Sequence, residues 1–191
     1  MTHAVLTESA FRTTPLSKVL LAAVGAALIT AGAKISVPMW PVPMTFQTFA
    51  VLIIGAAYGP GLGLLTVVCY LALGAVGINV FAGDGSQVGI AYMLGGTGGY
   101  LVGFAIAAGL LGMLARRGWD RSVLSMAGAL ILGNMVIYVP GLLWLGLSFG
   151  WDKPILAWGL WPFLLGDALK LLLAALLVPA LWRAIRHASL K

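Results

Sequence analysis

Residues 35 to 83 form one uninterrupted stretch without a charged side chain. A helix that crosses the hydrocarbon core of a bilayer needs about 20 apolar residues, so the stretch is too long for a single crossing. YGPGLG at residues 58–63 is a turn signal that divides it. SVPMWPVPM at residues 36–44 cannot be regular helix, because its three prolines lack N–H donors and restrict their neighbours. The stretch therefore predicts two short helices after a proline-rich loop.

The whole chain shares this apolar character, with 61% hydrophobic and only 8% charged residues. Soluble domains carry about 25% charged residues, so this chain has too little polar surface to cover itself in water. We predict an all-α integral membrane protein with a single transmembrane domain over residues 1–191. The charge-free runs and turn signals place six transmembrane helices near residues 17–35, 46–58, 61–78, 90–115, 122–147 and 160–186.

Basic residues indicate how these helices are oriented. With both termini on the inner side, most of the 11 Lys and Arg residues fall inside: Arg12, Lys18, Arg116, Arg117, Arg121, Arg183, Arg186 and Lys191. The positive-inside rule then selects an N-in, C-in topology. The net charge of +6 is spread too thinly for a phosphate-tracking face, so no nucleic-acid partner is expected.

Small residues recur at four-residue spacing in the first helix. Ala22 and Ala26 form one such pair, and Ala27 belongs to a neighbouring row. Such rows let helix backbones approach closely in lipid. They predict either packing inside the bundle or a docking face for another membrane protein.

A glycine-rich stretch, YMLGGTGGYLVGF at residues 92–104, matches neither the dinucleotide-binding nor the Walker phosphate motif. Dense glycine at the start of a membrane helix instead allows non-helical backbone to line a cavity. We expect Gly98 and Gly99 to lie beside a ligand there, near a positive helix end.

Catalytic chemistry finds little support in the sequence. Both histidines, His3 and His187, lie at the chain ends, and no His, Cys or carboxylate cluster has metal-ligand spacing. The chain also lacks a nucleotide-binding motif. We therefore expect neither an enzyme nor a bound metal, and no ATP-driven transport by this chain alone.

The stretch WPFLLGDALKLLL at residues 161–173 carries two charges inside an apolar helix. Asp167 and Lys170 are three residues apart and share a helix face. Intramembrane ionisable residues usually face a cavity or each other, so the pair is either self-neutralising or the polar end of a ligand pocket.

In the predicted topology Asp167 and Lys170 lie one to two turns below the outer surface. Other candidate residues lie around this outer rim of the bundle, although each alone could be a helix cap or a contact between helices. Polar candidates are Thr45, Gln47 and Asn79, and apolar walls are Trp40, Phe81 and Tyr100. The combination suits a small organic ligand with a polar head.

Four segments, in order, resemble the BioY family: PVPMTFQTFAVLIIGAAYGPGLG, YLALGAVGINVFAG, LGGTGGYLVGF and FLLGDALK. Members of that family are the biotin-specific S components of energy-coupling-factor (ECF) transporters. The resemblance implies a six-helix protein of the bacterial cytoplasmic membrane that captures biotin from outside and needs no cofactor. It also implies a transmembrane coupling (T) component and two cytoplasmic ATPases of the ABC type as partners.

The resemblance assigns roles by position. Asn79, Asp167 and Lys170 match the family's polar ligand-binding positions, and the remaining rim residues would complete the biotin pocket. The alanine row, with Ala22, Ala26 and Ala27, would dock the coupling component. An alternative stays open, in which the chain is a self-sufficient secondary biotin transporter that uses Asp167 for proton coupling.

Overall fold

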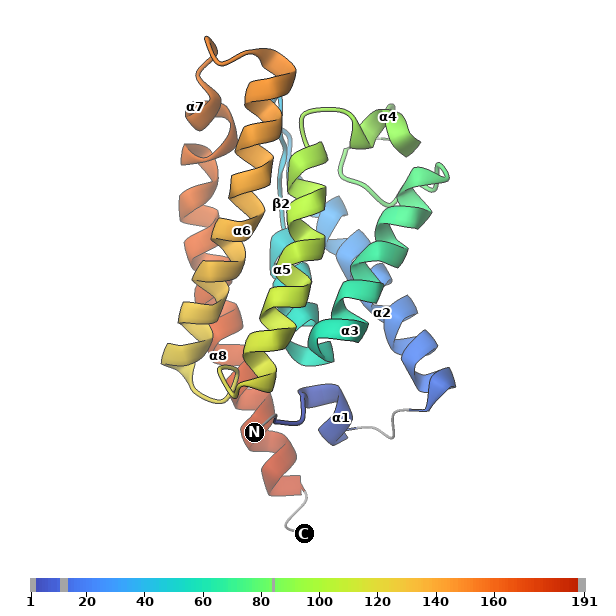
Figure 1. The fold of residues 1–191 in the computed structure, drawn as a ribbon, viewed down its shortest axis with the longest axis vertical. Coiled ribbons are helices and arrows are strands. Elements are labelled where there is room, and N and C mark those ends of the chain that lie inside the picture. Colours follow the sequence, from blue (N-terminus) through green and yellow to red (C-terminus); the bar gives the residue numbers. More distant parts are fainter. Residues whose placement is uncertain (1–2, 11–13, 84, 189–191) are drawn as a thin grey trace.

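The computed structural model describes residues 3–10, 14–83 and 85–188, so Arg12 and Lys191 lie outside the described residues. The helices are α1 (Leu6–Ala10), α2 (Pro15–Lys34), α3 (Gln47–Ala75), α4 (Gly89–Met93), α5 (Gly98–Arg116), α6 (Val123–Phe149), α7 (Ile155–Gly159), η1 (Trp161–Phe163) and α8 (Leu164–Ala188). Strands β1 (Ser36–Val37) and β2 (Met44–Thr45) pair antiparallel and flank the proline-rich loop. The N- and C-terminal ends lie at one end of the bundle, and α4 and α7 lie at the other (Figure 1).

The long helices have the length and composition of membrane spans. Five segments qualify among the described residues: α2, α3, α5, α6 and the run Ile155–Ile185, which includes α7, η1 and most of α8. The predicted class, a helical multi-pass membrane protein, is therefore confirmed, whereas the count of six separate helices is not.

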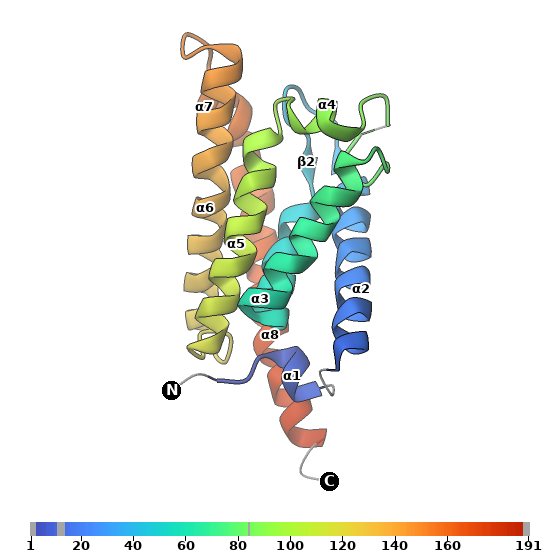
Figure 2. The same cartoon turned by 45° about the vertical axis from the view of Figure 1, so that its right-hand side comes forward.

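The second and third predicted helices are the two arms of α3, which meet at Gly59. Gly59 has φ 80° and ψ 176°, a conformation that only glycine adopts readily, and Pro60 follows it. A Cβ added to Gly63 would lie 3.1 Å from the Cα of Gly55, although eight residues of straight helix would span about 12 Å. The chain thus reverses at Gly59, and the later arm of α3 runs back along the bundle (Figures 1 and 2).

The fourth predicted helix, residues 90–115, is interrupted. The short α4 ends at Met93 and α5 begins at Gly98. The intervening LGGT sequence contains two glycines, each of which costs about 1 kcal/mol relative to alanine in a helix. The sixth predicted helix begins with the single turn η1 before α8.

The three predicted docking alanines lie on two different faces of helix α2. Ala22 and Ala26 are buried in the bundle, whereas Ala27 is exposed. With 3.6 residues per turn, positions 22 and 26 share a face that position 27 does not. The exposed row at four-residue spacing is instead Ala23, Ala27 and Ala31, and the prediction for Ala22 and Ala26 is corrected accordingly.

Candidate functional site

A pocket lies between the loop after β1, the beginnings of α3 and α5, the middle of α6 and the start of α8. Most of its lining is apolar or aromatic, and the rest is polar. The lining residues are Val42, Pro43, Thr45, Gln47, Thr48, Tyr92, Thr97, Tyr100, Leu101, Phe104, Ile137, Tyr138, Phe163, Asp167 and Lys170. Its mixed lining is that of a site for a small organic molecule.

Asp167 and Lys170 form an ion pair at the polar end of this pocket. Both residues are buried, with 4% and 9% of their surface exposed. The Lys170 Nζ lies 2.9 Å from Asp167 Oδ1, as expected for side chains three residues apart on one face of α8. The two charges are thus paired with each other in the structure, and both remain part of the pocket wall.

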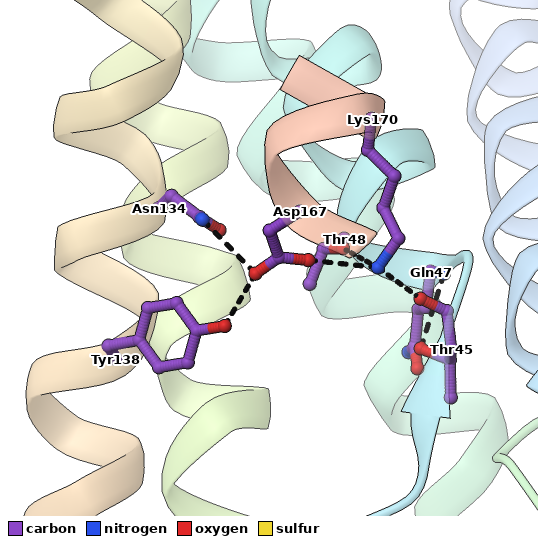
Figure 3. A network of polar contacts seen from close by, with 7 residues as sticks. All are labelled: Thr45, Gln47, Thr48, Asn134, Tyr138, Asp167 and Lys170. Atoms are coloured by element: carbon purple, nitrogen blue, oxygen red, sulfur yellow. Dashed lines mark hydrogen bonds and ion pairs between the residues drawn. The ribbon is translucent and has the colours of Figure 1, made fainter. Parts of the chain in front are cut away.

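Two side chains from α6 hold the other carboxylate oxygen. Asn134 Nδ2 donates to Asp167 Oδ2 at 3.1 Å, and the Tyr138 hydroxyl donates to the same atom (Figure 3). Asn134 and Tyr138 are four residues apart, so α6 presents them on one face. Neither was predicted from the sequence. The polar pair in the otherwise apolar run NMVIY was the signal that could have identified them.

Lys170 uses all three of its N–H donors within the protein. Besides Asp167, Nζ donates to the Thr45 carbonyl oxygen at 2.7 Å and to Thr48 Oγ1 at 3.3 Å (Figure 3). An ammonium group has three donors and no acceptor. A ligand oxygen that accepts from Lys170 must therefore replace one of these contacts, and the one to Thr48 is the longest.

Gln47 connects the pocket to the loop that follows α3. Its Nε2 donates to the Tyr70 hydroxyl at 2.8 Å, and that hydroxyl donates to the Val80 carbonyl oxygen at 3.1 Å. Tyr100 forms another wall, with its hydroxyl donating to the Gly159 carbonyl oxygen at 2.8 Å. The predicted residues Thr45, Gln47, Tyr100, Asp167 and Lys170 are thus brought together around one pocket.

The structure places three other predicted residues away from the pocket lining. Asn79 is exposed, and its Oδ1 accepts from Lys34 Nζ at 2.7 Å. Phe81 is buried behind the wall and stacks on Tyr92, with ring centroids 4.7 Å apart. Trp40 is 70% exposed and packs edge-on against neighbouring rings.

Gly98 and Gly99 serve helix packing in the structure. A Cβ on Gly99 would lie 2.1 Å from the Pro140 carbonyl oxygen, and one on Gly98 would lie 2.9 Å from the Trp144 ring. These contacts bring the start of α5 against α6, so the two glycines do not line the pocket as predicted. The glycine spacing here indicates close packing of α5 against α6, because residues without a Cβ let the two helix backbones approach each other.

The arrangement suits binding of an organic ligand. The apolar walls can enclose a hydrocarbon or ring system, and the polar end offers a carboxylate, an ammonium and hydroxyl groups within a few ångströms of one another. Such a site fixes a ligand that has hydrogen-bond donors and an acceptor at one end. In the described part of the chain, no group of three His, Cys, Asp or Glu residues could hold a metal ion.

Comparisons with known proteins agree on one family. The model of the BioY family matches residues 3–187. The probable biotin transporter BioY of Pyrococcus horikoshii is 41% identical over 164 residues, which is 86% of this chain and 95% of the relative. The biotin transporter BioY of Thermotoga maritima is 36% identical over 164 residues, covering 85% of this chain and 94% of the relative.

A solved structure shares the fold. The crystal structure of the S-component for biotin from an ECF-type ABC transporter has a TM-score of 0.73 and 24% sequence identity. The match covers 90% of this chain and 95% of the solved chain.

Proposed function

Because the chain belongs to the BioY family, we propose that it is the biotin-binding S component of an ECF-type uptake transporter. The observation that carries the proposal is the buried polar network of Asp167, Lys170 and their partners at one end of an apolar pocket. The ureido ring of biotin has two N–H donors and one acceptor oxygen, which match a carboxylate and an ammonium. Its hydrocarbon portion matches the apolar walls.

In this proposal the ureido ring binds at the Asp167–Lys170 end. The ureido oxygen accepts from Lys170 by replacing the 3.3 Å contact to Thr48 Oγ1. A ureido N–H donates to Asp167, whose carboxylate has about four acceptor positions, of which three are occupied. Asn79, which is bonded to Lys34 in this structure, would reach biotin only after a rearrangement of the loop after α3.

In this proposal, partner proteins drive the transport of biotin. The chain would cross the inner membrane six times, counting both arms of α3, with both termini in the cytoplasm. A T component and two ABC-type ATPases would supply the energy, since this sequence has no phosphate-binding motif of its own. The exposed row Ala23, Ala27 and Ala31 on α2 is the proposed contact with the T component, because small residues permit close helix approach.

Calorimetric titration of biotin tests the site. Replacing Asp167 or Lys170 by alanine should weaken binding by about 10- to 100-fold, since losing a charged hydrogen-bond partner costs about 1.5–3 kcal/mol. The exposed ion pair Asp152–Lys153, at 2.9 Å, provides a matched control in which the same substitutions should leave the Kd unchanged. If all four single variants bind biotin as tightly as the wild type, Asp167 and Lys170 do not contribute to the site.

Reconstitution separates the S component from a self-sufficient transporter. The purified chain in proteoliposomes should bind biotin tightly yet accumulate none, with or without a pH gradient. Uptake driven by the pH gradient alone, abolished by Asp167→Asn, would instead support proton coupling.

A further inference from the structure

A second hollow lies at the end of the bundle that holds the chain termini, between α1, α2, α3 and the end of α5. It shares no lining residue with the first pocket. Its lining combines two cations, Lys18 and Arg116, with the apolar or aromatic side chains of Tyr58, Leu62 and Leu65. None of these residues belongs to the proposed biotin site.

The charged side of the hollow favours an anion. Lys18 is exposed in the first turn of α2 and forms no ion pair with any residue that the structure describes. Arg116, in the last turn of α5, pairs with Glu8 of α1. A guanidinium has five N–H donors, so Arg116 keeps donors for another group. Two cations against one carboxylate leave the hollow with a net positive charge.

The other side of the hollow continues into the apolar surface of the bundle. Leu65 is 51% exposed, and a Cβ on Gly61 would meet no atom within 4 Å. Leu64 and Val68, on the same arm of α3, are also exposed. A molecule in the hollow can therefore place a charged group near Lys18 while its hydrocarbon part lies along α3.

We propose that this hollow binds an anionic phospholipid. Its phosphate would lie between Lys18 and Arg116, and one acyl chain would follow Leu65 and Val68. Basic pockets between membrane helices on the cytoplasmic side recognise acidic lipid head groups. Because one such lipid would contact α1, α2, α3 and α5 together, its binding fastens the N-terminal segment to the bundle. The site is separate from the biotin pocket, and its cytoplasmic position rests on the topology given in the proposed function.

Native mass spectrometry of the purified full chain tests the proposal with phosphatidylglycerol and phosphatidylcholine as probes. The wild type should retain phosphatidylglycerol in preference to phosphatidylcholine. Lys18→Gln should lower that preference about fivefold, the expected effect of one basic residue near a membrane surface. Lys153→Gln, which removes an exposed cation from the loop between α6 and α7, outside the lining of the hollow, should leave the preference unchanged.

Arg116 needs a paired design because it also contacts Glu8. The double variant Glu8→Gln/Arg116→Gln removes the ion pair without leaving a lone carboxylate, and it should also lose the phosphatidylglycerol preference. A thermal unfolding curve for each variant establishes that it is folded.

Three results would overturn the proposal. The first is equal retention of the two lipids by the wild type. The second is an unchanged preference in Lys18→Gln. The third is displacement of phosphatidylglycerol by millimolar inorganic phosphate, which would assign the hollow to a free anion.

Discussion

Asp167 is held by side chains from two helices, and this determines what the residue can do. Lys170 binds one carboxylate oxygen, and Asn134 and Tyr138 bind the other. The plane of the carboxylate is therefore set by α6 as well as by α8. A carboxylate that is already oriented loses less conformational entropy when a ligand binds, so binding is more favourable.

Tyr138→Phe tests this positioning role. The substitution keeps the ring and removes only the donor to Asp167, so the biotin Kd should rise about tenfold, equivalent to about 1.4 kcal/mol. Tyr58→Phe, a half-buried tyrosine outside the pocket, should leave the Kd unchanged. Titration calorimetry measures both. An unaltered Kd in Tyr138→Phe would show that Lys170 and Asn134 suffice to orient the carboxylate.

Asp120 is a second buried carboxylate, in the loop between α5 and α6. It is 1% exposed, accepts a hydrogen bond from Trp182 Nε1 of α8, and lies 3.4 Å from Arg121 Nε. The Arg121 guanidinium also lies 3.3 Å from the centre of the Trp182 ring. Burial raises the pKa of Asp120 above its usual 3.8, and the Trp182 hydrogen bond and the Arg121 charge oppose that rise only in part.

The raised pKa predicts a pH-dependent stability difference. The folded chain holds this proton to a higher pH than the unfolded chain, so the contribution of Asp120 to the free energy of unfolding is fully present below pH 3.8. It declines as the pH rises through the folded-state pKa. The stability of the wild type relative to Asp120→Asn should therefore fall from acid towards neutral pH and then level off. Thermal unfolding of both proteins across that range measures it, and a constant or rising difference would contradict the assigned direction.

At the scale of the elements, glycine decides where helices bend and how closely they pack. Gly59 reverses α3, which allows Gln47 at the start of one arm to reach Tyr70 on the other. Gly99 lets α5 approach the Pro140 carbonyl of α6. Together these contacts bring Gln47 and Tyr100 to the same pocket.

Gly99→Ala should destabilise the contact between α5 and α6. Its Cβ would lie 2.1 Å from the Pro140 carbonyl oxygen, and overpacking of this kind typically costs about 1–3 kcal/mol. Gly109→Ala, in the same helix with nothing within 4 Å of the added Cβ, should be neutral or slightly stabilising. Comparison of the two unfolding midpoints in detergent tests this prediction. A stable Gly99→Ala protein would mean that α5 and α6 are less closely packed.

At the scale of the whole molecule, α2 has one face buried in the bundle and one exposed. Its outer face carries Ala23, Ala27 and Ala31 beside the exposed side chains of Leu20, Val24 and Leu28. In the proposed function, this division separates biotin binding, which uses the bundle interior, from assembly with the T component, which uses the outer face of α2. A substitution on the outer face can therefore affect transport alone.

Ala27→Leu should leave biotin binding intact and lower biotin uptake by cells that contain the partner subunits. The larger side chain would hold the T component away from α2, because close helix packing in lipid requires small residues. Ala180→Leu, at an exposed position of α8, is the matched control and should transport normally. Normal uptake by Ala27→Leu would place the T-component contact on another surface.

The sequence by itself determined the class of protein and the local geometry of its charges. A chain with 8% charged residues cannot cover itself in water, and a spacing of three residues on a helix places Asp167 beside Lys170. The turn at Gly59 and the non-helical proline-rich loop followed from backbone chemistry, which is also local. These features depend on neighbours within a few residues.

Only the tertiary structure decided which distant side chains meet. Asn134 and Tyr138 reach Asp167 because α6 packs against α8 in a particular register, and the sequence does not state that register. The same reason places Asn79 beside Lys34, and Gly99 against α6, outside the pocket where they were expected. Contacts between helices depend on rotation and close approach, whereas contacts within one helix depend on spacing alone.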